Sequence, residues 1–184
     1  MEKWLVRFMG GRSKDAVDWC TNEISTRYST FNFIHANVAN KYANDAQGDD
    51  AESYKLPFPD DTYDLVFLTS VFSHMRPEQI RAYLHEISRV MKIGGSCYAT
   101  YYLIDDFARE QIANNKAAQR FKHDFGNFLS THKRVPEQTI AVREQLIRSY
   151  YQESGLSIQE PILFGSWANR PIHYHYQDVI VATK

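Results

Sequence analysis

The sequence predicts one α/β domain over residues 1–184, because strand-like and helix-like segments alternate along it and no repeat or linker divides it. Residues Tyr63 to Leu68 are almost continuously apolar, which indicates a strand covered on both faces and therefore a central parallel strand. Beyond Pro77, apolar residues recur at helical spacing, at Ile80, Leu84, Ile87 and Met91. This alternation favours a sheet with helices on both faces.

The first expected elements are a helix, a strand and a loop. The helix runs from Lys14 to Ser25 and carries its apolar residues on one face. The strand runs from Phe31 to Val38, and residues 39–54 form a loop because they hold asparagines, a glycine and several acids. We interpret Trp4 to Met9 as the remnant of a helix, within a tail formed by residues 1–12.

The remaining elements follow from the same patterns. The helix that begins at Pro77 is expected to end at Gly94-Gly95, where glycine supplies a left-handed cap. Residues 117–136 are aromatic but show no regular period, and their structure stays open. The other expected elements are a strand from Cys97 to Ile104, helices from Asp105 to Lys116 and from Gln138 to Glu153, and strands from Ser157 to Phe164 and from Tyr176 to Thr183. No helix separates the last two strands, which predicts an antiparallel pair at one side of the sheet.

Composition and cysteine usage exclude several classes of function. Lys and Arg total 21 against 22 for Asp and Glu, and the basic residues are scattered, so no nucleic-acid groove is expected. No apolar run approaches the roughly 18 residues of a membrane-spanning helix, so no membrane partner is expected. Cys20 and Cys97 fit no metal-binding or CxxC spacing, which favours free thiols in a cytoplasmic protein. His173 and His175 lie near Asp178, but two close ligands are too few, and no metal is expected.

Candidate site residues follow the predicted strands, because ligands of open α/β sheets bind beyond the carboxyl ends of the strands. Asn37 lies in the polar stretch at the end of the first strand, and Thr69, Ser70 and His74 lie in the turn after the central strand. Two interpretations stay open for each. The short polar side chains can hydrogen-bond a planar heterocycle or merely cap turns, and His74 can serve as a general base, an orienting group or a helix cap.

Aromatic residues make up 14% of the chain, with twelve tyrosines among them. An aromatic-rich sheet accounts for this content. The alternative is an aromatic-lined pocket for an apolar or planar ligand. Tyr101 and Tyr102 lie toward the end of the strand from Cys97 to Ile104, at the same expected edge of the sheet as the turn after the central strand.

Three ordered segments, Leu56 to Phe67, Thr69 to Met75 and Tyr83 to Gly95, carry a resemblance. They resemble the class I S-adenosylmethionine-dependent methyltransferases of the small, type 11-like kind. The resemblance continues more loosely over most of the chain. It implies a Rossmann-like methyltransferase sheet, mostly parallel with an antiparallel C-terminal strand. It also implies S-adenosylmethionine as cofactor and a small molecule as methyl acceptor.

The same resemblance implies roles for five residues. Asn37 matches the position that hydrogen-bonds the adenine amino group, and Val38 lies beside the adenine ring. Thr69 and Ser70 match the strand end that lies against the methionine part of the cofactor. His74 lies on the turn that faces the substrate and is the implied catalytic residue.

One part of the family pattern is missing. The eight glycines include no Gly-x-Gly spacing, so the glycine-rich cofactor loop is absent and the sheet is expected to be truncated at its N-terminal strands. Either the strand from Phe31 to Val38 pairs with the central strand, or a sheet edge stays open and favours a homo-oligomer. Two alternatives to an independent enzyme therefore remain: a non-catalytic interaction module, and an enzyme completed by a partner chain.

Overall fold

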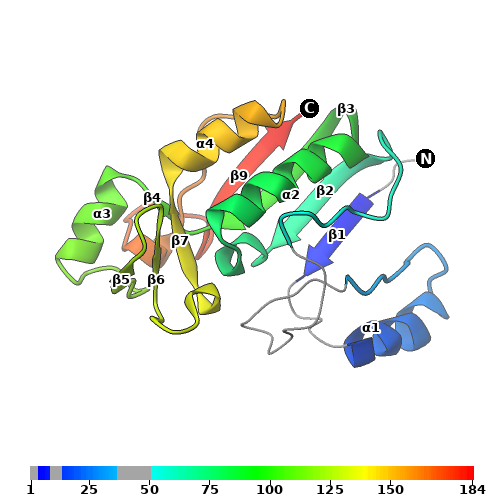
Figure 1. The fold of residues 1–184 in the computed structure, drawn as a ribbon, viewed down its shortest axis with the longest axis horizontal. Helices are drawn as coiled ribbons and strands as arrows, with labels where there is room; N and C mark the ends of the chain where they lie inside the picture. Colours follow the sequence, from blue (N-terminus) through cyan, green and yellow to red (C-terminus); the bar gives the residue numbers. More distant parts are fainter. Residues whose placement is uncertain (1–3, 9–13, 37–50) are drawn as a thin grey trace.

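The computed structural model describes residues 4–8, 14–36 and 51–184, and the strands among them form two sheets (Figure 1). The first sheet has the order β1-β2-β3-β9-β8 and the second the order β4-β7-β6-β5. The strands are β1 (Trp4–Phe8), β2 (Tyr63–Thr69), β3 (Met91–Tyr101), β4 (Leu103–Ile104), β5 (His123–Asp124), β6 (Phe128–Ser130), β7 (Ile140–Arg143), β8 (Ser157–Ile158) and β9 (Asp178–Thr183). The α-helices are α1 (Lys14–Cys20), α2 (Pro77–Val90), α3 (Asp106–Ala113) and α4 (Glu144–Glu153), joined by the 3-10 turns η3 (Phe72–His74), η4 (Pro136–Gln138) and η5 (Ser166–Ala168) and a π-helical turn η1 (Thr21–Ser25).

The five-stranded sheet confirms the predicted centre and the predicted antiparallel end. Strand β2 lies between β1 and β3 and is parallel to both, while β9 is antiparallel to β3 and to β8. Val66 and Leu68 are buried, whereas the side chains that alternate with them, Leu65 and Phe67, are only half-buried. One face of β2 therefore lies in the core, and its other face is partly open.

Helices α2 and α4 lie side by side over one face of this sheet (Figure 1). The four residues that the helical spacing singles out are all buried: Ile80, Leu84, Ile87 and Met91. Pro77 occupies the first turn of α2, and the backbone N–H of Arg76 donates to Oε1 of Gln79 over 2.9 Å. The proline in the first turn, the apolar period and the hydrogen bond at the N-terminus therefore all favour a helix in this segment.

Helix α2 ends at Val90, so the predicted end at Gly94-Gly95 is wrong. The next residue already belongs to β3, and both glycines lie within that strand. Gly94 has φ +80° and donates its N–H to the carbonyl of Lys184 over 2.9 Å. A Cβ on Gly95 would lie 2.9 Å from the Lys92 carbonyl oxygen and 3.2 Å from that of Asp64. The glycines therefore serve the close approach of β3 to β2 and to the C-terminus, and not a helix cap.

The prediction of one mostly parallel sheet is also wrong. Residues 138–143 were expected to be helical, yet Ile140–Arg143 form β7, which pairs with β4 in parallel and with β6 in antiparallel fashion. The N-terminal part of the expected helix is thus a strand, and α4 starts only at Glu144. Ile140, Ala141 and Val142 are buried in succession, as in a strand between two neighbours. The strands β5 and β6 come from the aromatic segment 117–136, whose sequence shows no regular period.

Two expectations for the N-terminal region need correction. Trp4–Phe8 is a strand, not the remnant of a helix, and pairs in parallel with β2 from Trp4 opposite Leu65 to Phe8 opposite Thr69. This strand occupies the place beside β2 for which residues 31–38 were considered. Residues 31–36 form no strand, and residues 37 and 38 lie outside the described part of the chain. The helix expected from Lys14 to Ser25 is confirmed as α1 and η1, with its apolar face half-buried.

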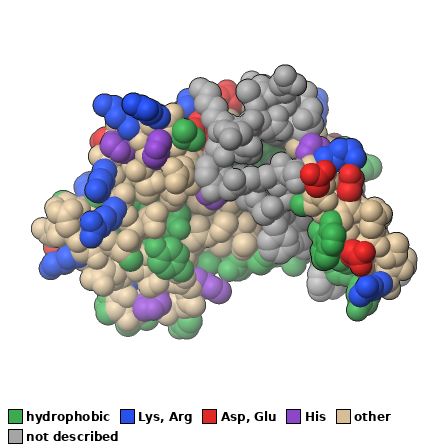
Figure 2. All heavy atoms as spheres, turned by 90° about the horizontal axis from the view of Figure 1, so that it is seen from below, with side chains coloured by type: hydrophobic (Ala, Val, Ile, Leu, Met, Phe, Trp, Pro, Cys, Tyr) green, Lys and Arg blue, Asp and Glu red, His purple; other side chains and the backbone are tan. Residues whose placement is uncertain are grey.

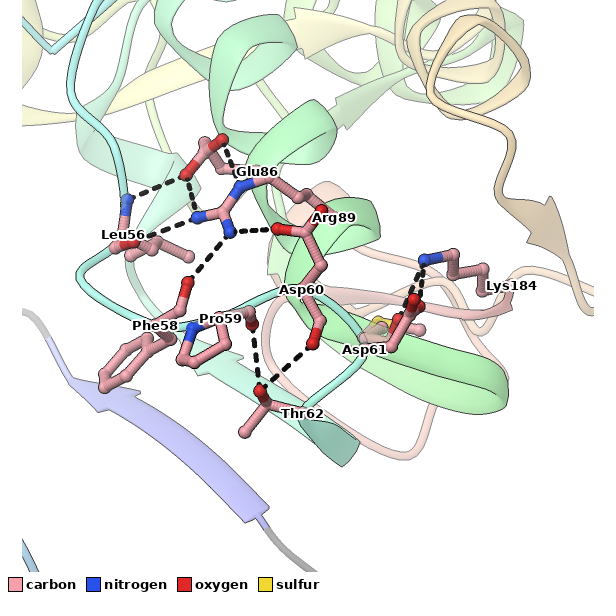
Figure 3. A network of polar contacts seen from close by, with 10 residues as sticks. Leu56, Phe58, Pro59, Asp60, Asp61, Thr62, Glu86, Arg89 and Lys184 are labelled. Carbon is pink, nitrogen blue, oxygen red and sulfur yellow. Dashed lines mark hydrogen bonds and ion pairs between the residues drawn. The ribbon is translucent and has the colours of Figure 1, made fainter.

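A polar network holds the segment before β2 against α2 (Figure 3). The guanidinium of Arg89 donates to the carbonyl oxygens of Leu56 (2.9 Å) and Phe58 (2.8 Å) and to the carboxylates of Asp60 and Glu86 (2.7 Å each). Glu86 in turn accepts the N–H of Leu56 over 2.8 Å. Hydrogen bonding from Arg89 lowers the pKa of Glu86. Arg89 therefore holds the segment that leads into β2 in place.

The surface carries charges of both signs. On the face drawn in Figure 2, Lys and Arg side chains lie at both ends of the molecule, with acidic side chains among them at the end where α1 lies. Lys14 and Asp18 pair there over 2.7 Å, and Arg27 and Glu23 over 3.3 Å. Such exposed pairs add little stability. None of the described helices is long and apolar enough to cross a membrane.

Candidate functional site: a pocket at the carboxyl ends of β2 and β3

A pocket of about 410 Å³ opens where β2 and β3 end. Its residues come from these two strands and from the segment that leads into β9. They are Phe67, Thr69, Ser70, Tyr98, Thr100, Tyr102, His175, Tyr176 and Gln177. The pocket lies at the edge of the sheet where ligands of open α/β sheets bind. It includes Thr69 and Ser70, which sequence reasoning selected.

Three polar side chains are linked at this pocket. The Ser70 N–H donates to Oγ1 of Thr100 over 2.9 Å, and the hydroxyls of Ser70 and Thr100 donate to Oε1 of Gln177 over 3.0 and 2.9 Å. Ser70 directly follows β2 and has φ +53°, in the left-handed region that non-glycine residues seldom occupy. Such strain is often found at functional sites. The network joins the ends of three strands that are distant in sequence.

Aromatic rings form the rest of the pocket lining. Phe67 and Tyr98 are partners across β2 and β3, and their rings stack with centroids 4.6 Å apart and planes 18° from parallel. Tyr102 and Tyr176 meet edge to face, with centroids 6.2 Å apart. The alternation of a strand explains the grouping, because residues two apart point to the same face. Thr69 and Thr100 therefore share the face of Phe67 and Tyr98.

Among the described residues, the pocket lining carries no Asp, Glu, Lys or Arg. Burial raises the pKa of Tyr98, and burial together with the neighbouring Tyr176 raises the pKa of Tyr102 to about 12. Both hydroxyls therefore keep their protons at neutral pH. The pocket combines neutral hydrogen-bonding groups with aromatic surface.

Asp178 directly follows Gln177, a residue of the pocket lining. It is fully buried next to Gln177 and accepts hydrogen bonds from the N–H groups of Leu103 (2.6 Å) and Gly165 (2.7 Å) and from the indole of Trp167 (2.7 Å). Its oxygens thus face N–H donors. The described residues contain no group of three or more His, Cys, Asp or Glu side chains that could hold a metal ion. Burial raises the pKa of Asp178 to about 7.

His74 lies apart from the pocket lining, on the 3-10 turn η3. Its Nδ1 is 3.0 Å from the carbonyl oxygen of Glu137, which can only accept, so Nδ1 carries the proton. Glu137 is buried and pairs with Arg76 over 2.7 Å. The structure thus brings Thr69 and Ser70 together in the pocket lining. His74 instead contacts η4 through Glu137. Asn37 and Val38 lie outside the described residues.

Sequence reasoning missed most of the pocket. The sequence places Tyr102 near the end of a strand, but it does not single out Tyr98, Thr100, Tyr176 or Gln177 as site residues. The strand alternation could have linked Phe67 to Thr69 and Tyr98 to Thr100. No local signal places Gln177 beside Ser70, since that contact depends on the pairing of β3 with β9.

The fold is that of an α/β protein with parallel central strands and a pocket at their carboxyl ends. The model of the methyltransferase domain family matches residues 15–99. This match covers slightly less than half of the chain, and it agrees with the resemblance of the sequence to the class I S-adenosylmethionine-dependent methyltransferases.

Solved structures support the fold. The PH0226 protein of Pyrococcus horikoshii OT3 aligns with a TM-score of 0.57 at 16% identity, over 100% of this chain and 71% of that one. An S-adenosylmethionine-dependent methyltransferase from Clostridium acetobutylicum ATCC 824 aligns with a TM-score of 0.53 at 11% identity, over 100% and 75%. The 1,6-didemethyltoxoflavin-N1-methyltransferase of Burkholderia thailandensis, solved with 1,6-didemethyltoxoflavin and S-adenosylhomocysteine, aligns with a TM-score of 0.53 at 11% identity, over 100% and 71%.

The pocket residues fit one end of the family cofactor, S-adenosylmethionine. The hydroxyls of Thr69 and Ser70 and the carboxamide of Gln177 suit the polar methionine part. The rings of Phe67 and Tyr98 suit a sulfonium cation, which aromatic faces attract. Within residues 4–8, 14–36 and 51–184, no acid lines the pocket to hold the ribose hydroxyls.

Proposed function

We propose that this protein is a methyltransferase that uses S-adenosylmethionine to methylate a small molecule. The observation that carries the proposal is the pocket at the carboxyl ends of β2 and β3, which contains Thr69 and Ser70. In this proposal these two residues contact the methionine part of the cofactor, and Asn37 and Val38 contact its adenine ring. His74 orients the acceptor or takes its proton.

S-adenosylmethionine, when bound, supplies an electrophilic methyl group. The protein's contribution is then to hold donor and acceptor in line. The hydrogen bonds among Ser70, Thr100 and Gln177 keep the pocket side chains in fixed positions before any ligand binds. Prior ordering of this kind lowers the entropic cost of reaching a reactive arrangement.

Calorimetry with S-adenosylmethionine and S-adenosylhomocysteine tests the proposal. At 100 times its dissociation constant, a ligand should stabilise the protein by about 2.7 kcal/mol, which a thermal shift detects. Ser70→Ala should weaken binding because it removes the hydroxyl that bonds Gln177. Ser157→Ala, on exposed β8 and outside the pocket lining, is the matched control. No shift at millimolar ligand, or unchanged affinity in Ser70→Ala, would count against this assignment.

A second candidate is a non-catalytic interaction module or an enzyme completed by a partner chain. It is favoured by the absence of Gly-x-Gly from the given sequence and of acids from the part of the pocket lining that the structure describes. A module binds neither form of the cofactor. A partner-completed enzyme binds the cofactor only in the assembly, so calorimetry on the isolated chain and on the partner complex separates the two.

We further propose a homo-oligomer that forms through the edge of the five-stranded sheet. Among the described strands, β1 is at that edge and pairs only with β2. Unpaired edges offer backbone groups to another chain. Light scattering at micromolar concentration should detect a dimer or larger species, and a monomer would contradict it. In this proposal the chain is a single domain over residues 1–184 that works in the cytoplasm, in keeping with the free thiols Cys20 and Cys97.

A further inference from the structure

The segment from Lys116 to Lys122 carries basic side chains and lies against residues that line the pocket at the ends of β2 and β3. We propose that its three cations, Lys116, Arg120 and Lys122, bind a negatively charged group of the methyl acceptor. The acceptor is then a small molecule that carries a carboxylate or a phosphate. The inference rests on the proposed function, because it names the substrate class of the same site. These three residues form the basic rim of the pocket.

The basic rim is tied to the pocket by the residues on either side of Arg120. Oε1 of Gln119 accepts the hydroxyl of Tyr176 over 3.1 Å. The ring of Phe121 meets that of Tyr102 edge to face, with centroids 5.4 Å apart. Tyr102 and Tyr176 both belong to the pocket lining. Arg120 therefore stands between two residues that contact this lining.

No carboxylate neutralises the basic rim. Residues 116–134 hold five basic residues against one acid, Asp124, which accepts the N–H of Gly126 over 2.7 Å. The three cations of the rim are exposed, and none of them forms an ion pair with another described residue. Lys, Arg and His side chains gather at the end of the molecule that carries the second sheet (Figure 2). This end therefore offers unpaired positive charge.

The acids at the start of the neighbouring helix α3 already have partners. Asp105 pairs with Arg170 over 2.5 Å, and Asp106 pairs with Arg109 over 3.3 Å. On α2, Arg81 likewise pairs with a carboxylate over 2.6 Å. The unpaired cations of the basic rim thus differ from these cations, which carboxylates of the chain itself neutralise.

Unpaired cations beside a pocket favour an anionic ligand. Charges of one sign raise the local concentration of a ligand of the opposite sign. The guanidinium of Arg120 is a planar fork that can bind a carboxylate or a phosphate through two parallel hydrogen bonds. A neutral acceptor gains neither effect.

Two anions can meet the basic rim: the acceptor's own group and the methionine carboxylate of the cofactor. The proposed function assigns the methionine part to Thr69 and Ser70, whereas the rim segment contacts Tyr102 and Tyr176. The acceptor is therefore the favoured source of the negative charge.

Matched probes test the charge preference. The anions are 4-hydroxybenzoate and glycerol 3-phosphate, and their neutral counterparts are 4-hydroxybenzamide and glycerol. Calorimetry with and without S-adenosylhomocysteine should show at least one anion binding about three- to fivefold more tightly than its counterpart, as an ion pair at a surface predicts. The difference should shrink between about 0.01 and about 0.15 M ionic strength, because salt screens exposed charges. If neither anion binds more tightly than its counterpart, the inference is wrong.

Variants locate the preference for anions. Arg120→Gln should reduce it, Arg120→Gln/Lys122→Gln should abolish it, and Arg120→Lys should retain part of it because the charge remains. Lys55→Gln is the matched control, since it removes an exposed cation from the segment before β2, at the other end of that strand from the pocket. Circular dichroism checks the fold of each variant. If the double variant keeps the preference, or if Lys55→Gln loses as much of it, the basic rim is not the binding site.

The affinity for S-adenosylhomocysteine, which carries the methionine carboxylate, separates the two sources of the anion. This affinity should be the same in the parent protein and in Arg120→Gln/Lys122→Gln. If it falls while the preference for anionic probes stays, the rim holds the cofactor and the inference is wrong. A preference for anions that the double variant abolishes, without any cofactor binding, contradicts the proposed function alone. Cofactor binding without a preference for anions contradicts the inference alone.

Discussion

The hydroxyls of Tyr101 and Tyr151 share a hydrogen bond of 2.9 Å in the centre of the core, where both side chains are almost completely buried. Burial raises the pKa of each well above its ordinary value, so both hydroxyls keep their protons. Each hydroxyl is the other's partner across β3 and α4. The pair therefore acts as a unit.

Tyr151→Phe should lower the free energy of unfolding by about 1–3 kcal/mol, because it leaves the Tyr101 hydroxyl buried without its partner. The double variant Tyr101→Phe/Tyr151→Phe should recover part of this loss, since no unpaired hydroxyl remains. Urea denaturation of the four proteins measures the coupling. If the losses of stability in the two single variants simply add in the double variant, the two hydroxyls are not coupled.

At the scale of elements, local pattern decided α2 and β2, while long-range pairing decided β1 and β7. Helix α2 has a regular apolar period and a proline at its start, so it could be predicted. Trp4–Phe8 has no such pattern, and its identity as a strand depends on its register with β2, about sixty residues away. Residues 140–143 lie next to a genuine helical pattern, yet pairing with β4 and β6 makes them a strand.

The contact between α2 and the segment before β2 gives a second prediction. Arg89→Ala should lower stability by about 2–4 kcal/mol, because it leaves the largely buried Glu86 without its cation and two backbone carbonyls without their donor. Hydrogen exchange at Leu56 should speed up. Arg81→Ala, on the same helix, breaks only an exposed pair with Glu153 and should cost less than about 1 kcal/mol. Equal losses of stability in the two variants would contradict the role of Arg89 in holding the segment before β2 against α2.

At the scale of the whole molecule, Asp178 joins the two sheets. It begins β9 in the first sheet and accepts the N–H of Leu103 at β4 in the second, together with Gly165 and Trp167. The burial that raises its pKa to about 7 outweighs these donors and the nearby Arg170, which lower it. Its titration is therefore linked to folding.

An aspartate titrates near 3.9 in an unfolded chain, so the folded protein holds this proton more tightly. Between about pH 4 and about pH 7, the folded protein keeps the Asp178 proton and the unfolded chain releases it. The free energy of unfolding should therefore fall as pH rises through this range, by at most about 1.4 kcal/mol per pH unit. Asp178→Asn, which does not titrate, should lack this component. Denaturation of both proteins across this range measures the difference. If the parent protein instead gains stability relative to Asp178→Asn as pH rises, the predicted direction of the pH dependence is wrong.

The sequence by itself determined the α/β class, the central strand, helix α2 and the antiparallel end, because periodicity and turn chemistry act over a few residues. It also selected Thr69 and Ser70 from their place after an apolar strand. Only the tertiary structure decided that a second sheet forms, that β1 occupies the place beside β2, and that Tyr98, Thr100 and Gln177 join Ser70 at one pocket. Those outcomes depend on strand register, and register depends on contacts between residues far apart in the chain.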